Sequence, residues 1–160
     1  MSVTAHFLPG NGGLPGDSRQ AGFEANHTIF YVARAVLEGG VHLGKFRADW
    51  HAAAIPYAGQ ERWVSNYEVW VGKLSPDNAG GVWDKANVNN AALVGGHEAD
   101  GTPLYAARAW HEGGLHLGKW RADWTAASIS YAGGEVWVGQ FEVLSDGQYF
   151  EGDPAFGWQR

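Results

Sequence analysis

The 160-residue chain has no cysteine, a single methionine and a formal net charge of −6 at pH 7. The absence of cysteine excludes a disulfide framework and any thiolate metal site. The excess of acidic residues argues against nucleic acid as a partner, because proteins that bind it present a basic surface to the phosphates. The sequence contains no apolar run of about 18 residues, so we expect no helix that crosses a membrane.

The first residues, MSVTAHFLPGNGG, contain neither the basic segment nor the apolar segment of a secretory signal peptide. We therefore expect a cytoplasmic location by default, with release by a non-classical route as the alternative. The chain holds no dense motif of metal ligands. No metal and no cofactor is expected.

Glycine and tryptophan are abundant, at 24 and 9 residues, and 45% of the residues are hydrophobic against 18% charged. These proportions are typical of a globular protein rather than a disordered one. Many glycines together with many aromatic residues favour short strands joined by tight turns. The composition therefore predicts a β protein.

The chain contains two copies of one unit. EGGVHLGKFRADW (38–50) and EGGLHLGKWRADW (112–124) differ at two positions, and a shift of 74 aligns 22–69 with 96–143 without a gap, with 30 of 48 residues identical. We divide the chain into a first repeat (1–73), a second repeat (74–144) and an aromatic C-terminal extension (145–160). Two such units are too small to bury enough surface separately, so we expect a pseudo-twofold pair that shares one core.

Each unit is predicted to consist of strands. Residues 62–71 alternate between two faces, and 28–37 are β-branched and aromatic, with counterparts at 136–144 and 103–110. Turns are expected at the glycine-containing steps Gly-Gly, Leu-Gly-Lys and Tyr-Ala-Gly, and a short helical turn in RADWHAAAI. The expected fold class is all-β, with two tandem antiparallel modules.

The order of the motifs resembles the DM9 repeat, the tandem unit also found at the head of natterin-like proteins. The shared pattern is a glycine and an acidic residue, an aromatic strand ending in Arg-Ala, a glycine-rich segment closing with Gly-Lys, an aromatic-x-Gly-x-Glu step, and an aromatic-Glu-Val strand. In the first repeat these motifs are Gly22 and Glu24, then 31–35, 39–45, 57–61 and 67–69. The second repeat has the same motifs 74 residues later, and together they cover about three quarters of the chain.

The resemblance implies a two-repeat lectin that recognises mannose or high-mannose glycans, with host defence as its biology. In the family an acidic residue near the start of each repeat and the lysine of the Gly-Lys step contact the sugar. At the matching positions this chain has Glu24 with Lys45, and Glu98 with Lys119. It departs from the family in having glutamate where aspartate is common, and Leu-Gly-Lys where Pro-Gly-Lys is usual.

Carboxylate and ammonium groups suit this chemistry, because a carboxylate accepts hydrogen bonds from two adjacent sugar hydroxyls and an ammonium group donates to sugar oxygens. The alternative for the same residues is a structural ion pair or solvated surface charge. Glu61 and Glu135 follow glycine turns, where they would either line the site or cap backbone amides.

Other recurring residues are expected to be structural. Arg34 and Arg108 lie within apolar strands and should pair with Glu68 and Glu142, since an unpaired buried charge is costly. His42 and His116 are expected to pack in turns or to support neighbouring groups through hydrogen bonds rather than to bind metal. The recurring tryptophans, expected in the core, are Trp50, Trp124, Trp63 and Trp137.

The sequence favours a binding protein over an enzyme. Duplicated acids at symmetric positions suggest paired ligand sites, and neither Gly-x-Ser-x-Gly nor His-Glu-x-x-His occurs. The 160 residues leave no room for the membrane-inserting module of natterin-like toxins, so no membrane insertion is expected. The competing hypothesis is a protein-interaction or structural module without glycan binding. A homodimer is expected, since two-site lectins often dimerise.

Overall fold

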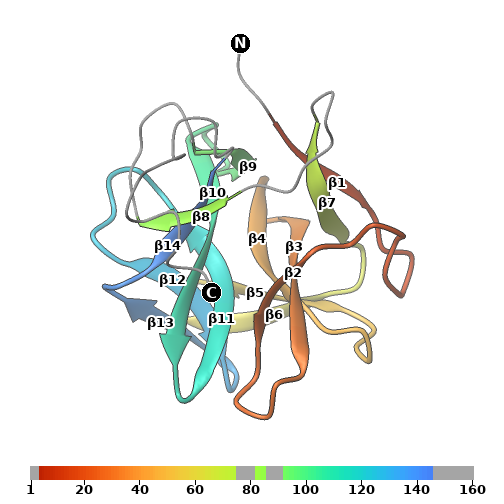
Figure 1. Cartoon of the computed structure of the whole chain (residues 1–160). Coiled ribbons are helices and arrows are strands. Elements are labelled where there is room, and N and C mark those ends of the chain that lie inside the picture. The colour runs from red at the N-terminus through yellow and green to blue at the C-terminus, as the bar shows by residue number, and fades with distance from the viewer. Residues whose placement is uncertain (1–3, 75–81, 86–91, 146–160) are drawn as a thin grey trace.

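The computed structural model describes residues 4–74, 82–85 and 92–145, and all regular structure in these ranges is β-strand (Figure 1). The strands are β1 (Thr4–Pro9), β2 (Gln20–Phe23), β3 (Ile29–Leu37), β4 (Gly40–Phe46), β5 (Ala53–Tyr57), β6 (Gln60–Val64), β7 (Glu68–Leu74), β8 (Val82–Lys85), β9 (Val94–His97), β10 (Pro103–His111), β11 (Gly114–Trp120), β12 (Ala127–Tyr131), β13 (Gly134–Val138) and β14 (Glu142–Ser145). All of them belong to one antiparallel sheet, which confirms the predicted all-β class.

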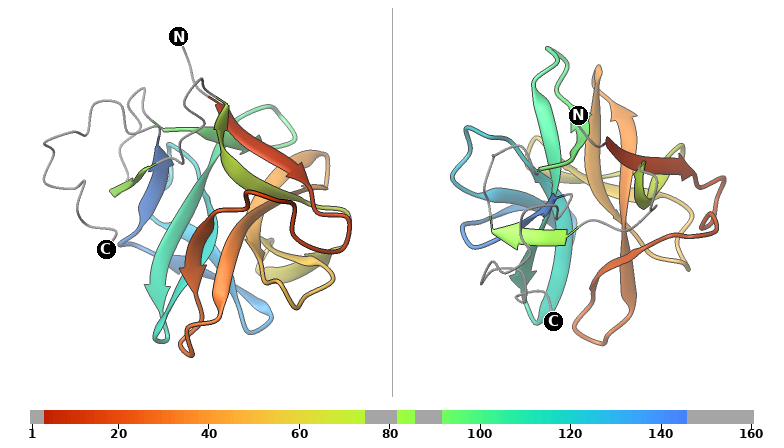
Figure 2. Two further views of the ribbon diagram at one scale, coloured as in Figure 1. Left: turned by 45° about the vertical axis from the view of Figure 1, so that its right-hand side comes forward. Right: turned by 45° about the horizontal axis from the view of Figure 1, so that its top comes forward.

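The strands follow the order β1-β7-β3-β2-β11-β12-β13-β6-β5-β4-β9-β10-β14-β8. Additional pairings of β3 with β4 and of β10 with β11 fold the sheet back on itself. The two halves lie side by side, one built from β2–β7 and the other from β9–β14 (Figure 2). The outer strands β1 and β8 extend these halves by pairing with β7 and β14.

The two repeats exchange strand contacts reciprocally. Phe23 of β2 is opposite Leu115 of β11, and the matching residue His97 of β9 is opposite Val41 of β4. Such an exchange, in which residue i meets j and j meets i, is the signature of a twofold relation. The predicted pseudo-twofold arrangement is thus present at the level of strand register.

The repeats also share apolar packing. One buried cluster includes Phe30 and Leu43 of the first repeat together with Leu104 and Leu117 of the second. Two further clusters belong to one repeat each, one around Phe46 and the other around Trp120 and its neighbours. The central cluster holds the two halves in fixed register, because burial of apolar surface dominates folding energetics.

The hairpin turns account for part of the repeated phrase. Glu38 and Gly39 both have positive φ, at 50° and 82°, and the corresponding Glu112 and Gly113 have 48° and 81°. Two successive positive φ values are those of a type I′ turn, which matches the twist of the strands that it joins. The turns predicted at the Gly-Gly steps are therefore present but begin one residue earlier, and the second glycine of each step is the first residue of a strand. The Tyr-Ala-Gly turns have the same form.

Three local predictions were wrong. Residues 62–71, expected to alternate as one strand, are divided between β6, which pairs with β5, and β7, which pairs with β3. The Leu-Gly-Lys step is not a turn but the middle of β4 and β11, where a Cβ on Gly44 would collide with the carbonyl oxygen of Ala54. Glycine is thus needed for close approach of neighbouring strands rather than for a turn. RADWHAAAI forms no helix: a single turn, closed by the Trp50 amide donating to Arg47 O at 2.9 Å, leads into β5.

The strand arginines are paired as predicted. Arg34 Nε donates to Glu68 at 2.8 Å, and Arg108 Nε donates to Glu142 at 2.7 Å. The second pair is almost completely buried, whereas Glu68 is 41% exposed. These ion pairs link β3 to β7 and β10 to β14, so they are structural.

Part of the proposed domain division lies outside the described residues. Residues 146–160 of the C-terminal extension and 75–81 near the junction of the repeats are in this category. Among the residues that are described, no helix is long and apolar enough to cross a membrane.

Candidate functional site

The two lysines of the Gly-Lys steps are buried between the repeats, each 3% exposed. Lys45 Nζ lies 2.9 Å from Nδ1 of His116 and donates to the carbonyl oxygen of Ser130 at 2.6 Å. Lys119 Nζ lies 2.8 Å from Nδ1 of His42. Each lysine therefore meets the histidine of the other repeat.

Strand geometry explains this exchange. His42 and Lys45 are three residues apart in β4, and successive side chains of a strand point to opposite faces. The two side chains of one phrase thus cannot meet each other. The pseudo-twofold arrangement brings Lys45 to His116 instead, and every site requires both repeats.

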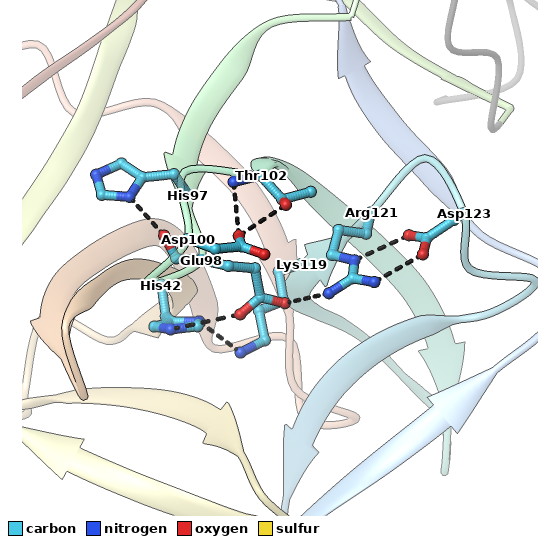
Figure 3. Close-up of polar contacts among 8 residues, drawn as sticks. All are labelled: His42, His97, Glu98, Asp100, Thr102, Lys119, Arg121 and Asp123. Carbon is cyan, nitrogen blue, oxygen red and sulfur yellow. Dashed lines mark hydrogen bonds and ion pairs between the residues drawn. The ribbon is translucent and has the colours of Figure 1, made fainter.

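Each site also contains the glutamate that the sequence predicted. Glu98 accepts a hydrogen bond from Arg121 Nη1 at 2.9 Å, and its other carboxylate oxygen lies 4.0 Å from His42 Nε2 (Figure 3). In the matching site Glu24 accepts from Arg47 Nη1 at 2.7 Å. Glu98 thus lies near Lys119, and Glu24 lies near Lys45. In each site the negative charge of the glutamate favours the charged form of the lysine.

Arg47 and Arg121 are site residues that the sequence reasoning missed. Arg47 donates to both oxygens of Asp49, at 2.9 and 2.6 Å, while it holds Glu24. Arg121 binds Asp123 in the same way, at 2.8 and 2.6 Å. The Arg-Ala-Asp ending of the repeated phrase was the available signal, because a bidentate arginine–aspartate pair requires both residues.

The electrostatics of the lysines and histidines are coupled. Burial lowers the pKa of Lys45 and of Lys119 to about 8, although nearby glutamates oppose the shift. Burial, reinforced by the neighbouring lysine, lowers the pKa of His42 to about 4 and that of His116 to about 3. At neutral pH each histidine is therefore uncharged, and its Nδ1 accepts a hydrogen bond from the lysine ammonium group.

Glu61 and Glu135 serve the role of backbone caps. Glu61 accepts from the Gly133 amide at 3.0 Å, and Glu135 accepts from the Gly59 amide at 2.8 Å. These bonds cross between the hairpins of the two repeats. The negative charge of each glutamate also opposes the lowering of the nearby lysine's pKa by burial.

Aromatic side chains surround the polar groups. The Lys45 ammonium group lies 4.6 Å from the ring centre of Phe30 and 5.9 Å from that of Tyr131, and Lys119 lies 5.1 Å from Tyr57. These contacts are within the range of cation–π attraction. They help to compensate the burial of each ammonium group.

The prediction that all four recurring tryptophans are core residues was half wrong. Trp50 and Trp124 are partly buried and pack against the central cluster. Trp63 and Trp137, in contrast, are 53% and 51% exposed. The recurring tryptophans therefore fall into two groups, one packed against the core and the other at the surface.

The two sites differ in detail. Ser130 O accepts from Lys45, whereas the position that matches Ser130 in the first repeat is Pro56. Phe30 beside Lys45 corresponds to Leu104 in the second repeat.

A separate hollow of about 480 Å³ lies over Arg34 and Glu68 and does not include the Glu/Lys residues. Each Glu/Lys site combines a partly exposed glutamate with a buried lysine.

Hydrogen-bonding groups of each site are partly exposed at the surface. Glu98 and Arg121 are 22% and 27% exposed at their side chains, so a ligand can reach an acceptor and a donor side by side. Within the described ranges, no group of three or more His, Cys, Asp or Glu side chains converges as metal ligands. Hydrogen bonding is the chemistry that this arrangement provides.

Comparison with known proteins agrees with the motif pattern. The DM9 repeat family model matches residues 24–138, and no curated protein matches the sequence. The crystal structure of the nematode sperm cell motility protein MFP2B is similar, with a TM-score of 0.64 and 16% identity over 91% of this chain and 47% of MFP2B. The chain spans about half of MFP2B, and this likeness shows the fold. Because the family model covers more than half of its residues, this chain belongs to the DM9 repeat family.

Proposed function

We propose that this protein is a lectin that binds mannose or high-mannose-type glycans at two composite sites. The observation that carries the proposal is the set of one glutamate, one arginine, one buried lysine and one histidine, assembled twice from both repeats. A set duplicated in this way fits a ligand with repeated identical groups, such as a branched glycan.

The geometry suggests how a sugar would bind. Glu98 has one oxygen on Arg121, and its remaining acceptor positions are open to adjacent sugar hydroxyls. Lys119 has three N–H donors, one of which is directed to His42 Nδ1. Each charge-assisted hydrogen bond contributes about 1.5–3 kcal/mol. Two or three such bonds give a monosaccharide roughly millimolar affinity.

Two sites on one rigid body strengthen binding to a branched ligand. When both sites engage one glycan, the second binding step becomes intramolecular, which raises the apparent affinity by about 10²–10⁴. This gain gives a physical reason for two sites in one chain.

A glycan array tests the proposal, with free mannose as competitor. We expect a signal on high-mannose glycans that mannose abolishes. A signal on other sugars would retain the lectin and change its specificity, as a consequence of glutamate in place of aspartate. No signal at high protein concentration would refute glycan binding.

The second candidate is a protein-interaction module. It is favoured by the fact that Arg47 is hydrogen-bonded to both Glu24 and Asp49, as in a purely structural network. MFP2B, which shares the fold, is a motility protein. This candidate predicts a blank array, and a partner whose binding is insensitive to mannose.

A further inference from the structure

We propose that Trp63 and Trp137 extend the two sites, so that each site takes at least a disaccharide, with the second sugar residue stacked on the exposed indole. This inference rests on the proposed lectin function and makes its ligand more specific. It starts from the exposure of the two side chains, 53% and 51%, at matched positions of β6 and β13.

Each exposed indole packs against the partly buried tryptophan of its own repeat. Trp63 meets Trp50 at 4.8 Å between ring centres with an interplanar angle of 74°, and Trp137 meets Trp124 at 4.9 Å and 79°. Edge-to-face contact is a preferred arrangement of aromatic pairs, and it leaves about half of each outer indole exposed. Both repeats therefore present the same flat apolar surface in the same way.

Strand register connects each indole to a lysine. Lys45 is opposite Ala54, which is opposite Trp63, so the three side chains follow one another on one face of β4, β5 and β6. The order Lys119, Ser128, Trp137 repeats this arrangement across β11, β12 and β13. Neighbouring strands lie about 4.8 Å apart. A ligand held at the lysine can thus reach the tryptophan through its next residue.

The arginine of each site is also connected to the exposed indole, through the partly buried tryptophan. The Arg47 guanidinium group, which binds Glu24, lies 5.1 Å from the ring centre of Trp50, and Trp50 contacts Trp63. Arg121 lies 5.2 Å from Trp124 in the other site. Each exposed indole is therefore connected both to the lysine and to the arginine of its site.

The chemistry of an oligosaccharide fits this surface. A pyranose ring has hydroxyl groups at its edge and a C–H face, and the face packs on an aromatic ring while the hydroxyls remain hydrated. The first sugar residue would bind Glu, Arg and Lys, and the second would cover the tryptophan. Covering an exposed indole removes apolar surface from water and so favours the longer ligand.

Trp110 provides a matched control within the chain. It is 52% exposed, it packs on Phe23 with 5.4 Å between ring centres, and the corresponding residue of the first repeat is Val36. Replacement of Trp110 removes a similar exposed surface outside the lysine–tryptophan rows.

The test compares methyl α-mannoside with α-1,2-linked mannobiose by calorimetric or NMR titration of four proteins: wild type, W63A/W137A, W63F/W137F and W110A. We expect mannobiose to bind about tenfold more tightly than the monosaccharide to wild type and W110A. In W63A/W137A the two sugars should bind equally, with the monosaccharide affinity unchanged, and the Phe variant should keep part of the gain.

Two outcomes would overturn the inference while the lectin function stands: wild type that binds both sugars equally, or W63A/W137A that keeps the disaccharide gain. A W63A/W137A protein that loses affinity for both sugars to the same extent would assign the tryptophans a structural role and would also overturn it. Folded wild type that binds neither sugar would refute the proposed function, and the inference with it.

Discussion

The Nζ atom of Lys45 lies 2.9 Å from Nδ1 of His116, although 71 residues separate them in the chain. Lys119 and His42 form the reciprocal contact at 2.8 Å. A single repeat contains a lysine and a histidine but cannot bring its own pair together, because they are on opposite faces of one strand. Assembly of the tandem pair therefore creates both sites at once.

The exchange predicts that a histidine substitution acts on the site of the other repeat. His116→Phe keeps an aromatic ring but removes one of the two acceptors of the buried Lys45 ammonium group, at a cost of about 1–3 kcal/mol in unfolding free energy. It should weaken sugar binding at Glu24 and Lys45, and leave Glu98 and Lys119 unchanged. NMR titrations with methyl α-mannoside measure both sites separately, and His42→Phe is the matched variant. Weaker sugar binding at the Glu98 site on replacement of His116 would contradict the pairing of each lysine with the histidine of the other repeat.

Acid should destabilise the fold through the two buried histidines. Their pKa values are about 4 and about 3, against an ordinary value of 6.5. Between pH 6.5 and these values the unfolded chain binds protons that the native chain does not, so the free energy of unfolding falls as pH is lowered. The loss is on the order of 3 kcal/mol for each histidine. Urea unfolding at pH 7, 6, 5 and 4 measures this loss. The free energy of unfolding of the H42F/H116F double variant should depend less on pH. Equal pH profiles for the variant and the wild type would refute the histidines as the cause.

In the alkaline range the free energy of unfolding should likewise rise with pH, here because of the two buried lysines. The lysines have a pKa of about 8 in the native state and 10.5 as the ordinary value. Between these values the unfolded chain binds more protons, so the free energy of unfolding rises with pH from about 8 to 10.5. Sugar affinity should instead fall above pH 8, because the lysine loses its charge. Titrations at pH 7 and 9 measure the affinity, and an unchanged value would argue against lysine as a ligand.

The two arginine–glutamate pairs should differ in their contribution to stability. Glu142→Gln leaves the buried Arg108 without a charged partner and should cost about 3–5 kcal/mol. Glu68→Gln changes a pair that is open to solvent and should cost about 1 kcal/mol or less. Urea unfolding of both variants gives the comparison. Equal costs would show that burial does not distinguish the pairs.

The glycine of the Gly-Lys step should tolerate no side chain. A Cβ on Gly44 would collide with Ala54 O, and one on Gly118 with Ser128 O. Both contacts are with backbone, which cannot move aside, so Gly44→Ala should destabilise by about 3 kcal/mol or prevent folding. Gly139→Ala, where the new Cβ meets no atom within 4 Å, should change stability by less than about 0.5 kcal/mol. Thermal unfolding compares them, and a stable Gly44→Ala protein would contradict the account.

Much of this fold was predictable from local patterns. The glycine turns and the gapless repeat predicted strands and a pseudo-twofold pair, although the alternation over 62–71 did not reveal the break between β6 and β7. The Arg34 and Arg108 ion pairs followed from the cost of an unpaired charge in an apolar strand. These features depend on neighbours in sequence or on simple burial.

The composite nature of the site could not be predicted from one repeat. Which histidine meets Lys45 depends on how β4 and β11 are placed across the molecule, and periodicity carries no such information. The exposure of Trp63 was missed for a similar reason. Large aromatic residues are buried on average, and the register that places Trp63 at the surface beside the site is set by tertiary packing.

Both composite sites should bind a sugar. A two-dimensional NMR titration of the wild-type protein with methyl α-mannoside tests it most directly, with K119M as the variant that disables one site and preserves side-chain volume. We expect saturable shift changes of the amides around Glu24, Lys45, Glu98 and Lys119 in wild type, and only around the first two in K119M. Shift changes that are absent at high millimolar sugar, or that are confined to the hollow over Arg34 and Glu68, would contradict it.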